Sequence, residues 1–195
     1  MATQFGFLSK LEFLQDWASI AIAGINPAVV HNLGKYLTLK KVHYLSTIEG
    51  IQGDYLEFGV YTGSSFCHSI RCYKKLAKLN AKTLSTKFYG FDSFEGFGDL
   101  NEDDEHPFYT DENFTTSLKT VTNRVERVAK NVKFKLVPGF FSDSLKEGAK
   151  KIGIEKSRII FIDSDTYSSA SEALVFCAPT IQQGTFIILD DYYSY

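Results

Sequence analysis

The sequence lacks several features that membrane, secreted, nucleic-acid-binding and metal-thiolate proteins require. Its longest apolar stretch, residues 18–25, is far shorter than the roughly 20 residues that cross a bilayer, so we expect no membrane partner. The first residues carry no basic segment, which gives no sign of a secretory signal. A net charge of −2 argues against nucleic acid as the main partner. The three cysteines have no metal-ligand spacing, and we interpret them as reduced thiols of a cytoplasmic protein.

Two common catalytic motifs are also missing. None of the four histidines stands in an H-E-x-x-H pair, so we expect them to be structural or exposed. No serine stands in a G-x-S-x-G elbow, which argues against a hydrolase triad. What remains is ordinary for a globular protein, because 44% of the 195 residues are hydrophobic and 23% are charged. This length and composition can build one core.

The hydrophobic spacing changes at about residue 50. In residues 1–50, apolar residues recur three and four positions apart, which predicts helices with a buried face that serve as a substrate cap or in oligomer contacts. In residues 51–195, short apolar runs alternate with segments long enough for crossover helices, which predicts a doubly wound, parallel α/β sheet. The predicted strands are 55–60, 87–92, 132–137, 159–163 and 185–190, and the predicted crossover helices are 64–79, 113–130, 143–152 and 168–181.

Acidic residues and glycines gather where the predicted strands end. Because the carboxyl ends of parallel strands lie at one edge, where open α/β sheets bind their ligands, we expect the functional site at this edge. The residues concerned are, in chain order, Glu57, Gly59, Asp92, Gly139, Asp163, Asp165, Asp190 and Asp191.

The first strand leads into a turn with two glycines. Gly59 and Gly63 are four residues apart, whereas a dinucleotide site prefers the spacing G-x-G-x-x-G. Glu57 precedes this turn and would repel a pyrophosphate, so it better suits a ligand with an amine or another positive centre. Asp92 at the end of the second strand could accept hydrogen bonds from the two hydroxyls of a ribose. A strand-to-helix turn without a ligand stays open as the alternative.

Two pairs of carboxylates follow the fourth and fifth strands. Asp163 and Asp165 are two residues apart and can point to the same side, and Asp190 and Asp191 leave the last strand. Four carboxylates without a cation would repel one another, and their oxygens suit Mg²⁺ or Ca²⁺ better than zinc. Capping of the helix that follows is the alternative for either pair alone.

An acidic segment follows the second strand. Residues 99–112 contain seven acidic residues and no lysine or arginine. One interpretation is a solvated surface loop. The other is a mobile lid beside the site, in which Phe108 and Tyr109 would contact a ligand.

Five motifs in this order resemble the class I S-adenosylmethionine-dependent methyltransferases, and within them the macrocin O-methyltransferase (TylF-like) family of metal-dependent sugar O-methyltransferases. The motifs are 53–60, 89–96, 139–145, 163–169 and 184–192. The resemblance implies a Rossmann-like sheet with strand order 3-2-1-4-5, in which residues 51–195 form the S-adenosylmethionine-binding core. It also implies Mg²⁺-dependent methyl transfer to a hydroxyl of a sugar or of a glycosylated small molecule.

The same resemblance implies a role for individual residues. Asp165 would be the general base, and Asp163, Asp190 and Asp191 would bind Mg²⁺. The residues that would line the cofactor site are Glu57, Gly59, Tyr61, Thr62, Gly63, Ser65, Asp92, Ser93, Phe94, Gly139, Phe140, Ser142 and Asp163.

The chain departs from this family pattern at its end. Class I methyltransferases usually continue after the fifth strand with a helix and an antiparallel hairpin, which the sequence up to Tyr195 does not contain. We therefore expect either a fragment or a sheet edge covered by a partner chain, as in a homodimer. Two other functions stay open: a catalytically incomplete cofactor-binding module that serves in interactions, and a nucleotide-sugar glycosyltransferase that uses the D-x-D at Asp163.

Overall fold

The computed structural model describes residues 10–83, 85–98, 100, 104 and 114–190. The chain divides into two compact units, Met1–Leu37 and Thr38–Tyr195. The first unit contains helix α2 (Glu12–Ala23) and the beginning of helix α3 (Pro27–Ile48). Proline suits the first position of a helix, and the Asn26 side chain accepts a hydrogen bond from the backbone N–H of Ala28 at 2.9 Å.

The buried face predicted for the first helix is not observed. No residue of α2 is buried, and the side chains of Phe13 and Trp17 are 67% and 77% exposed. The spacing therefore predicted the helix correctly but not the burial of its apolar face. Among the described residues, no helix combines the length and hydropathy that crossing a membrane requires.

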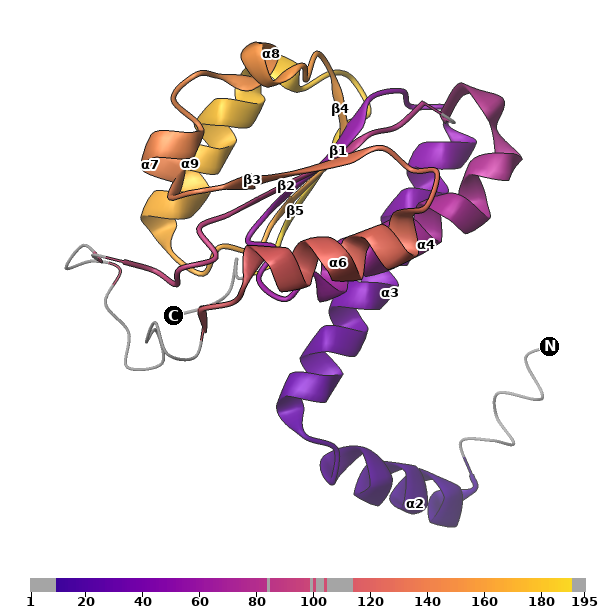
Figure 1. The fold of residues 1–195 in the computed structure, drawn as a ribbon. Helices are drawn as coiled ribbons and strands as arrows, with labels where there is room; N and C mark the ends of the chain where they lie inside the picture. Colours follow the sequence, from indigo (N-terminus) through magenta and orange to yellow (C-terminus); the bar gives the residue numbers. More distant parts are fainter. Residues whose placement is uncertain (1–9, 84, 99, 101–103, 105–113, 191–195) are drawn as a thin grey trace. The chain divides into compact units, whose positions relative to one another are not determined.

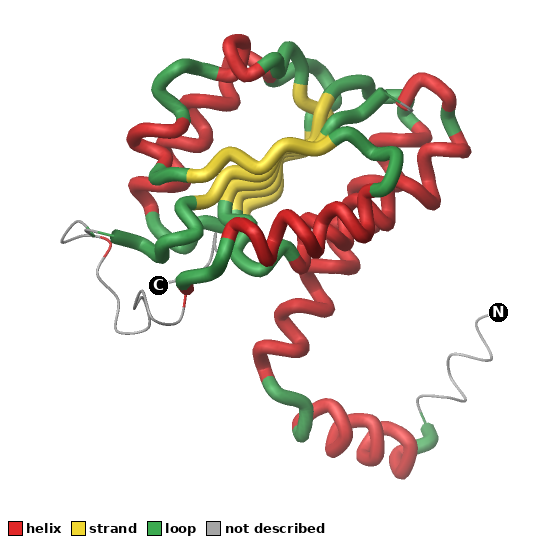
Figure 2. The backbone as a smooth tube through the Cα atoms, viewed as in Figure 1, coloured by secondary structure: helices red, strands yellow, loops and turns green. Residues whose placement is uncertain are grey.

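Five parallel strands form the sheet of the second unit (Figures 1 and 2). Their order is β3-β2-β1-β4-β5, which confirms the predicted strand order. Each strand is short, and those in the centre of the sheet are buried over their whole length, as both covered faces require. The strands are β1 (Asp54–Phe58), β2 (Phe88–Asp92), β3 (Phe134–Pro138), β4 (Ser157–Ile162) and β5 (Phe186–Leu189).

Helices cover both faces of this sheet. Figure 1 shows α4 (Ser64–Leu76) and α6 (Leu118–Ala129) on one side, and α7 (Phe141–Ser144), α8 (Ala149–Ile152) and α9 (Tyr167–Cys177) on the other. Short 3-10 helices, η1 (Ala77–Leu79), η2 (Ala81–Thr83) and η4 (Ala178–Thr180), occupy the connections. The single helix predicted over 143–152 is therefore wrong. Gly148 has a φ of +76° and separates α7 from α8.

The alternation of side chains along β1 divides the core in two. Leu56 and Phe58 point to the side of α9, where Phe58 stacks on Phe91 with ring centroids 4.7 Å apart. Tyr55 and Glu57 point to the opposite side, toward α4, because alternate residues of a strand share a face. A carboxylate thus lies inside a layer that is otherwise mostly apolar.

Candidate functional site

Residues that follow the strands meet at one edge of the sheet. Gly59, Gly139, Asp163 and Asp190 each donate a backbone N–H to a carbonyl of a neighbouring strand, at distances of 2.9, 3.0, 2.8 and 3.0 Å. These bonds continue the parallel ladders by one residue beyond the strands. The structure therefore brings four of the residues singled out in the sequence to the carboxyl edge, where open α/β sheets bind ligands.

A cavity of about 460 Å³ lies at this edge. Eight of the residues expected at the site line it: Gly59, Tyr61, Asp92, Ser93, Phe140, Ser142, Asp163 and Asp165. Seven other expected residues that the structure describes are not part of its lining: Glu57, Thr62, Gly63, Ser65, Phe94, Gly139 and Asp190. The sequence pattern did not single out the remaining lining residues, which are Gly96, Phe97, Leu100, Phe114, Phe141, Ser164, Thr166, Ser168, Ser169 and Glu172.

Gly59 lies where the backbones that follow β1 and β4 approach each other closely. Its φ is +87°, and a Cβ atom at this position would lie 1.8 Å from the carbonyl oxygen of Asp163. No side chain can occupy that space, so only glycine lets the two loops meet at the cavity.

Asp92 organises the loops on both sides of it. One carboxylate oxygen accepts the backbone N–H of Tyr61 and the other accepts that of Phe94, each at 2.7 Å. Tyr61 and Phe94 both have positive φ values, +48° and +60°, which few non-glycine residues adopt. Burial raises the pKa of Asp92, and the backbone hydrogen bonds from Tyr61 and Phe94 oppose this shift. Because a carboxylate can accept further hydrogen bonds, Asp92 can still receive ligand hydroxyls.

The glycine turn ends at the N-terminus of α4. Gly63 is the N-cap residue, with φ of +76°, and no side chain caps the helix. From α6, Arg124 donates a hydrogen bond to the carbonyl oxygen of Thr62 at 2.8 Å. Its position on the predicted helix 113–130 favours a side chain that faces solvent, and the structure contradicts this expectation. An arginine on an amphipathic helix gives no sequence signal that distinguishes solvent from a distant carbonyl.

Asp165 lies in the turn between β4 and α9. Its φ is +60°, a left-handed conformation that costs a non-glycine residue about 1–3 kcal/mol unless the surroundings hold it. The cap of α9 is Thr166, whose hydroxyl accepts the N–H of Ser169 at 3.3 Å. The cap of this helix is therefore made by the hydroxyl of Thr166. The alternative that Asp163 or Asp165 caps the helix gains no support from this hydrogen bond. The strained turn directs Asp165 to the lining of the cavity.

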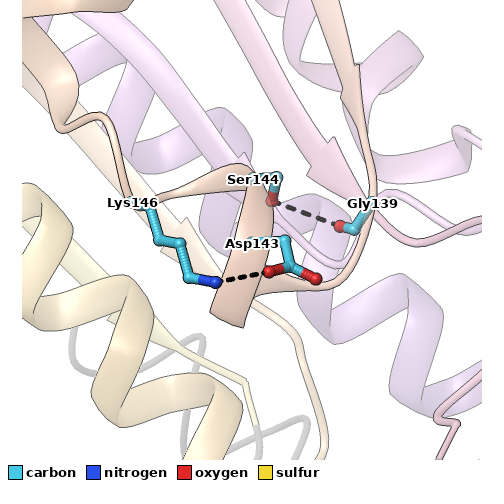
Figure 3. A network of polar contacts seen from close by, with 4 residues as sticks. All are labelled: Gly139, Asp143, Ser144 and Lys146. Atoms are coloured by element: carbon cyan, nitrogen blue, oxygen red, sulfur yellow. Dashed lines mark hydrogen bonds and ion pairs between the residues drawn. The ribbon is translucent and has the colours of Figure 1, made fainter.

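The loop after β3 forms another wall of the cavity. The hydroxyl of Ser144 donates a hydrogen bond to the carbonyl oxygen of Gly139 at 3.2 Å, and Lys146 pairs with Asp143 at 2.6 Å. Figure 3 shows both contacts. The first bond closes the turn that carries Phe140 into the cavity lining. Phe140 also packs closely on Gly98, where a Cβ atom would lie 2.8 Å from its ring.

The expected metal ligands follow two adjacent strands. Asp163 and Asp190 come directly after the paired residues Ile162 and Leu189 of β4 and β5. Asp191 lies outside the described residues. Over the part of the chain that the structure describes, no three side chains of histidine, cysteine, aspartate or glutamate form a group that could hold a metal. The chemistry of the two aspartates, which offer only oxygen, still fits a hard cation.

Asp104 is the one residue within 101–113 that the structure describes. It is 7% exposed, and its carboxylate accepts the backbone N–H of Tyr167, the first residue of α9, at 2.9 Å. A carboxylate at this position satisfies a free N–H and complements the helix dipole. An acidic residue predicted to be either solvated or part of a lid is thus fixed beside the turn of Asp165.

We expect Asp104→Ala to lower the free energy of unfolding by about 1 kcal/mol, the usual effect of losing a helix cap. Asp143→Ala is the matched control, because its pair with Lys146 is exposed and should contribute less than about 0.5 kcal/mol. Urea denaturation of both variants measures the difference. Equal stability of the two variants would show that the contact of Asp104 does not hold α9.

The chain matches known proteins over most of its length. The model of the Macrocin-O-methyltransferase (TylF) family matches residues 10–195. The chain is 29% identical over 154 residues to mycinamicin III 3''-O-methyltransferase of Micromonospora griseorubida, which covers 74% of this chain and 57% of that protein. It is 27% identical over 176 residues to an 8-demethyl-8-(2,3-dimethoxy-alpha-L-rhamnosyl)-tetracenomycin-C 4'-O-methyltransferase of Streptomyces olivaceus, which covers 85% of this chain and 64% of that protein.

Two solved structures share the fold. The calicheamicin methyltransferase CalS11 superimposes with a TM-score of 0.69 at 18% identity, over 83% of this chain and 65% of that one. The O-methyltransferase NovP gives a TM-score of 0.66 at 19% identity, over 82% of this chain and 65% of that one. The chain thus spans less than two thirds of the length of each of these four proteins. Its sheet is the core of class I methyltransferases, and the chain belongs to the Macrocin-O-methyltransferase (TylF) family.

Proposed function

We propose that this protein is an S-adenosylmethionine-dependent O-methyltransferase that acts on a hydroxyl of a sugar or of a glycosylated small molecule. The observation that carries the proposal is the cavity at the carboxyl edge of the sheet, where Gly59, Asp92 and Asp165 come together. Membership in the family supports the methyl transfer, and both curated relatives are named as O-methyltransferases, the second of them of a rhamnosyl-tetracenomycin. The same membership disfavours the glycosyltransferase alternative.

Different residues would bind the ribose, methionine and adenine parts of the proposed cofactor. Asp92 would accept the ribose hydroxyls, because it lines the cavity and is the last residue of β2. The N-terminus of α4 has no side-chain cap and directly follows the turn of Gly59 and Tyr61, which line the cavity, so its backbone N–H groups would bind the carboxylate of the methionine part. Phe140 and Ser142, from the β3–α7 loop, would line the adenine. S-adenosylmethionine supplies a methyl group that its sulfonium already activates, so the protein mainly has to align the reacting atoms.

The acceptor needs a base, because a sugar hydroxyl is a poor nucleophile at neutral pH. Asp165 lines the cavity and is the residue that would take the proton. Asp163 and Asp190, with Asp191, would hold Mg²⁺. A divalent cation bound there lowers the pKa of a hydroxyl that approaches it. The acceptor itself would be a small molecule with a free sugar hydroxyl.

Methyl transfer tests the proposal directly. The protein is incubated with S-adenosylmethionine that carries a labelled methyl group, with Mg²⁺ or EDTA, and with a panel of glycosylated compounds and nucleotide sugars. Label in an acceptor, and less of it with EDTA, supports both the activity and the metal. Binding of the cofactor without transfer to any acceptor would instead support the incomplete module. A homodimer stays a prediction, which light scattering tests.

We expect Asp92→Asn to weaken binding of S-adenosylhomocysteine about 10–100-fold, which is the effect of losing charge-assisted hydrogen bonds. The ribose hydroxyls donate to the charged form of Asp92, so the wild-type affinity should fall as the pH is lowered through its raised pKa. The variant cannot titrate at this position, and its affinity should be less dependent on pH over the same range. Calorimetric titrations between neutral and mildly acidic pH measure both effects. Parallel pH profiles would remove Asp92 from the ribose site.

A further inference from the structure

A buried network of four polar side chains lies next to the glycine turn. Ser65 donates a hydrogen bond to one carboxylate oxygen of Glu57 at 2.6 Å, and the hydroxyl of Tyr55 donates to the other. Ser69 in turn donates to the hydroxyl oxygen of Tyr55 at 3.0 Å. Glu57, Tyr55 and Ser69 are 0% exposed, and Ser65 is 4% exposed. The carboxylate of Glu57 is therefore fully buried and is not part of the cavity lining.

The network joins the two elements between which the turn runs. Tyr55 and Glu57 are two residues apart on β1 and share the face toward α4. Ser65 and Ser69 are four residues apart on α4 and therefore lie on one side of the helix. The turn of residues 59–63 is the only covalent connection between these two elements. Fixing the end of β1 against the first turn of α4 fixes both ends of the turn.

The cavity depends on the conformation of this turn. Gly59 and Tyr61 line it, and the backbone N–H of Tyr61 binds Asp92 at 2.7 Å. Tyr61 has a φ of +48°, which is costly for a residue other than glycine, so the turn needs support from its surroundings to keep this shape. A buried carboxylate with hydroxyl donors at both oxygens supplies rigid support, because leaving such a group without a partner is costly.

We propose that Tyr55 and Ser69 are positioning residues for the proposed cofactor site, which act through Glu57 on the turn of residues 59–63. The inference takes its ligand from the proposed function. The effect of the network on the turn does not depend on that function. Tyr55 holds one oxygen of Glu57, Ser69 orients the hydroxyl of Tyr55, and Glu57 holds Ser65 in the first turn of α4. None of the three touches the cavity, so their effect on a ligand has to pass through the turn.

The experiment compares Tyr55→Phe with Tyr73→Phe in the full chain. Tyr73 is a second buried tyrosine, 6% exposed, that packs against Phe88 from α4 and is not part of the network. The first readout is the Kd for S-adenosylhomocysteine. Tyr55→Phe should raise the Kd about tenfold, since a buried carboxylate oxygen of Glu57 loses the hydrogen bond from the tyrosine hydroxyl. Tyr73→Phe should change the Kd less than about twofold. Ser69→Ala should give a smaller increase than Tyr55→Phe.

A double-mutant cycle separates positioning from a general loss of stability. If Tyr55 acts through Glu57, adding Tyr55→Phe to Glu57→Gln should raise the Kd less than Tyr55→Phe does alone. Strictly independent effects, or equal effects of Tyr55→Phe and Tyr73→Phe, would overturn the inference.

Amide hydrogen exchange at residues 59–63 provides a readout that needs no ligand. Exchange should be faster in Tyr55→Phe than in wild type and unchanged in Tyr73→Phe. Unchanged exchange in Tyr55→Phe overturns the inference, even if the protein binds the cofactor. If wild-type protein does not bind S-adenosylhomocysteine, the proposed function fails, and the exchange rates still decide whether the network positions the turn.

Discussion

Replacing Gly59 with alanine should abolish binding of S-adenosylhomocysteine. It should also lower the free energy of unfolding by about 4 kcal/mol or more, which is the size of effect that severe backbone strain produces. The added Cβ atom would lie 1.8 Å from the carbonyl oxygen of Asp163, a backbone atom that cannot turn away like a flexible side chain. The left-handed φ of +87° adds further strain. Relief requires separating the loops after β1 and β4, which both line the cavity.

Gly34→Ala is the matched control for this substitution. Gly34 lies within α3, and a Cβ atom there would meet no atom within 4 Å. Alanine is the better helix former by about 1 kcal/mol, so this variant should be as stable as wild type or more stable and should bind normally. Calorimetry and urea denaturation of both variants give the two quantities. Normal binding by Gly59→Ala would show that the loops do not approach as closely as the structure has them.

Replacing Asp165 with asparagine should lower kcat for methyl transfer about 10²–10⁴-fold, the usual contribution of a general base. Asparagine adopts positive φ more readily than most residues, so the turn at +60° should keep its shape. Binding of S-adenosylhomocysteine should therefore remain close to that of wild type. Single-turnover rates and calorimetric titration measure the two effects separately.

Asp165→Ala separates the base from the backbone conformation. Alanine lacks the carboxylate and also tolerates the left-handed turn poorly, so this variant should lose kcat and additionally some stability. If Asp165→Asn turns over as fast as wild type, Asp165 is not the base. If Asp165→Asn loses cofactor binding to the same degree as kcat, the residue serves mainly to shape the cavity.

The alternating pattern of residues 51–195 was sufficient to predict the sheet. Near-continuous apolar runs such as 159–162 are typical of strands with two covered faces, and β4 is buried along its whole length. The boundaries shifted by one or two residues where glycine or a bulge intervened. Gly59 ends β1 before the predicted residue 60, and β4 begins at Ser157, beside a bulge in its pairing with β1.

The polar residues at the strand ends were also predictable, because parallel strands place their carboxyl ends together. Gly59, Asp92 and Asp163 could be assigned to one edge before the structure was known. The sequence could not reveal which of these residues reach the cavity. Glu57 is one residue from the end of β1, and the pleat turns its side chain toward α4 and into the core.

Contacts between distant elements had no signal in the sequence. Arg158 is fully buried and donates hydrogen bonds to the hydroxyls of Ser46, Thr47 and Thr86. Burial lowers its pKa to about 10. An arginine just before a predicted strand looks like a surface residue, because periodicity describes one element at a time. The contact of Asp104 with Tyr167, 63 residues away, escaped prediction for the same reason.

Titration calorimetry with S-adenosylhomocysteine decides whether the carboxyl edge of this sheet holds S-adenosylmethionine. The folded protein is titrated with and without Mg²⁺, beside Asp92→Asn as the site-specific control. We predict micromolar binding by the wild type and weaker binding by the variant. Absence of binding by a folded wild-type sample, or equal binding by Asp92→Asn, would contradict the assignment of this cavity to the cofactor.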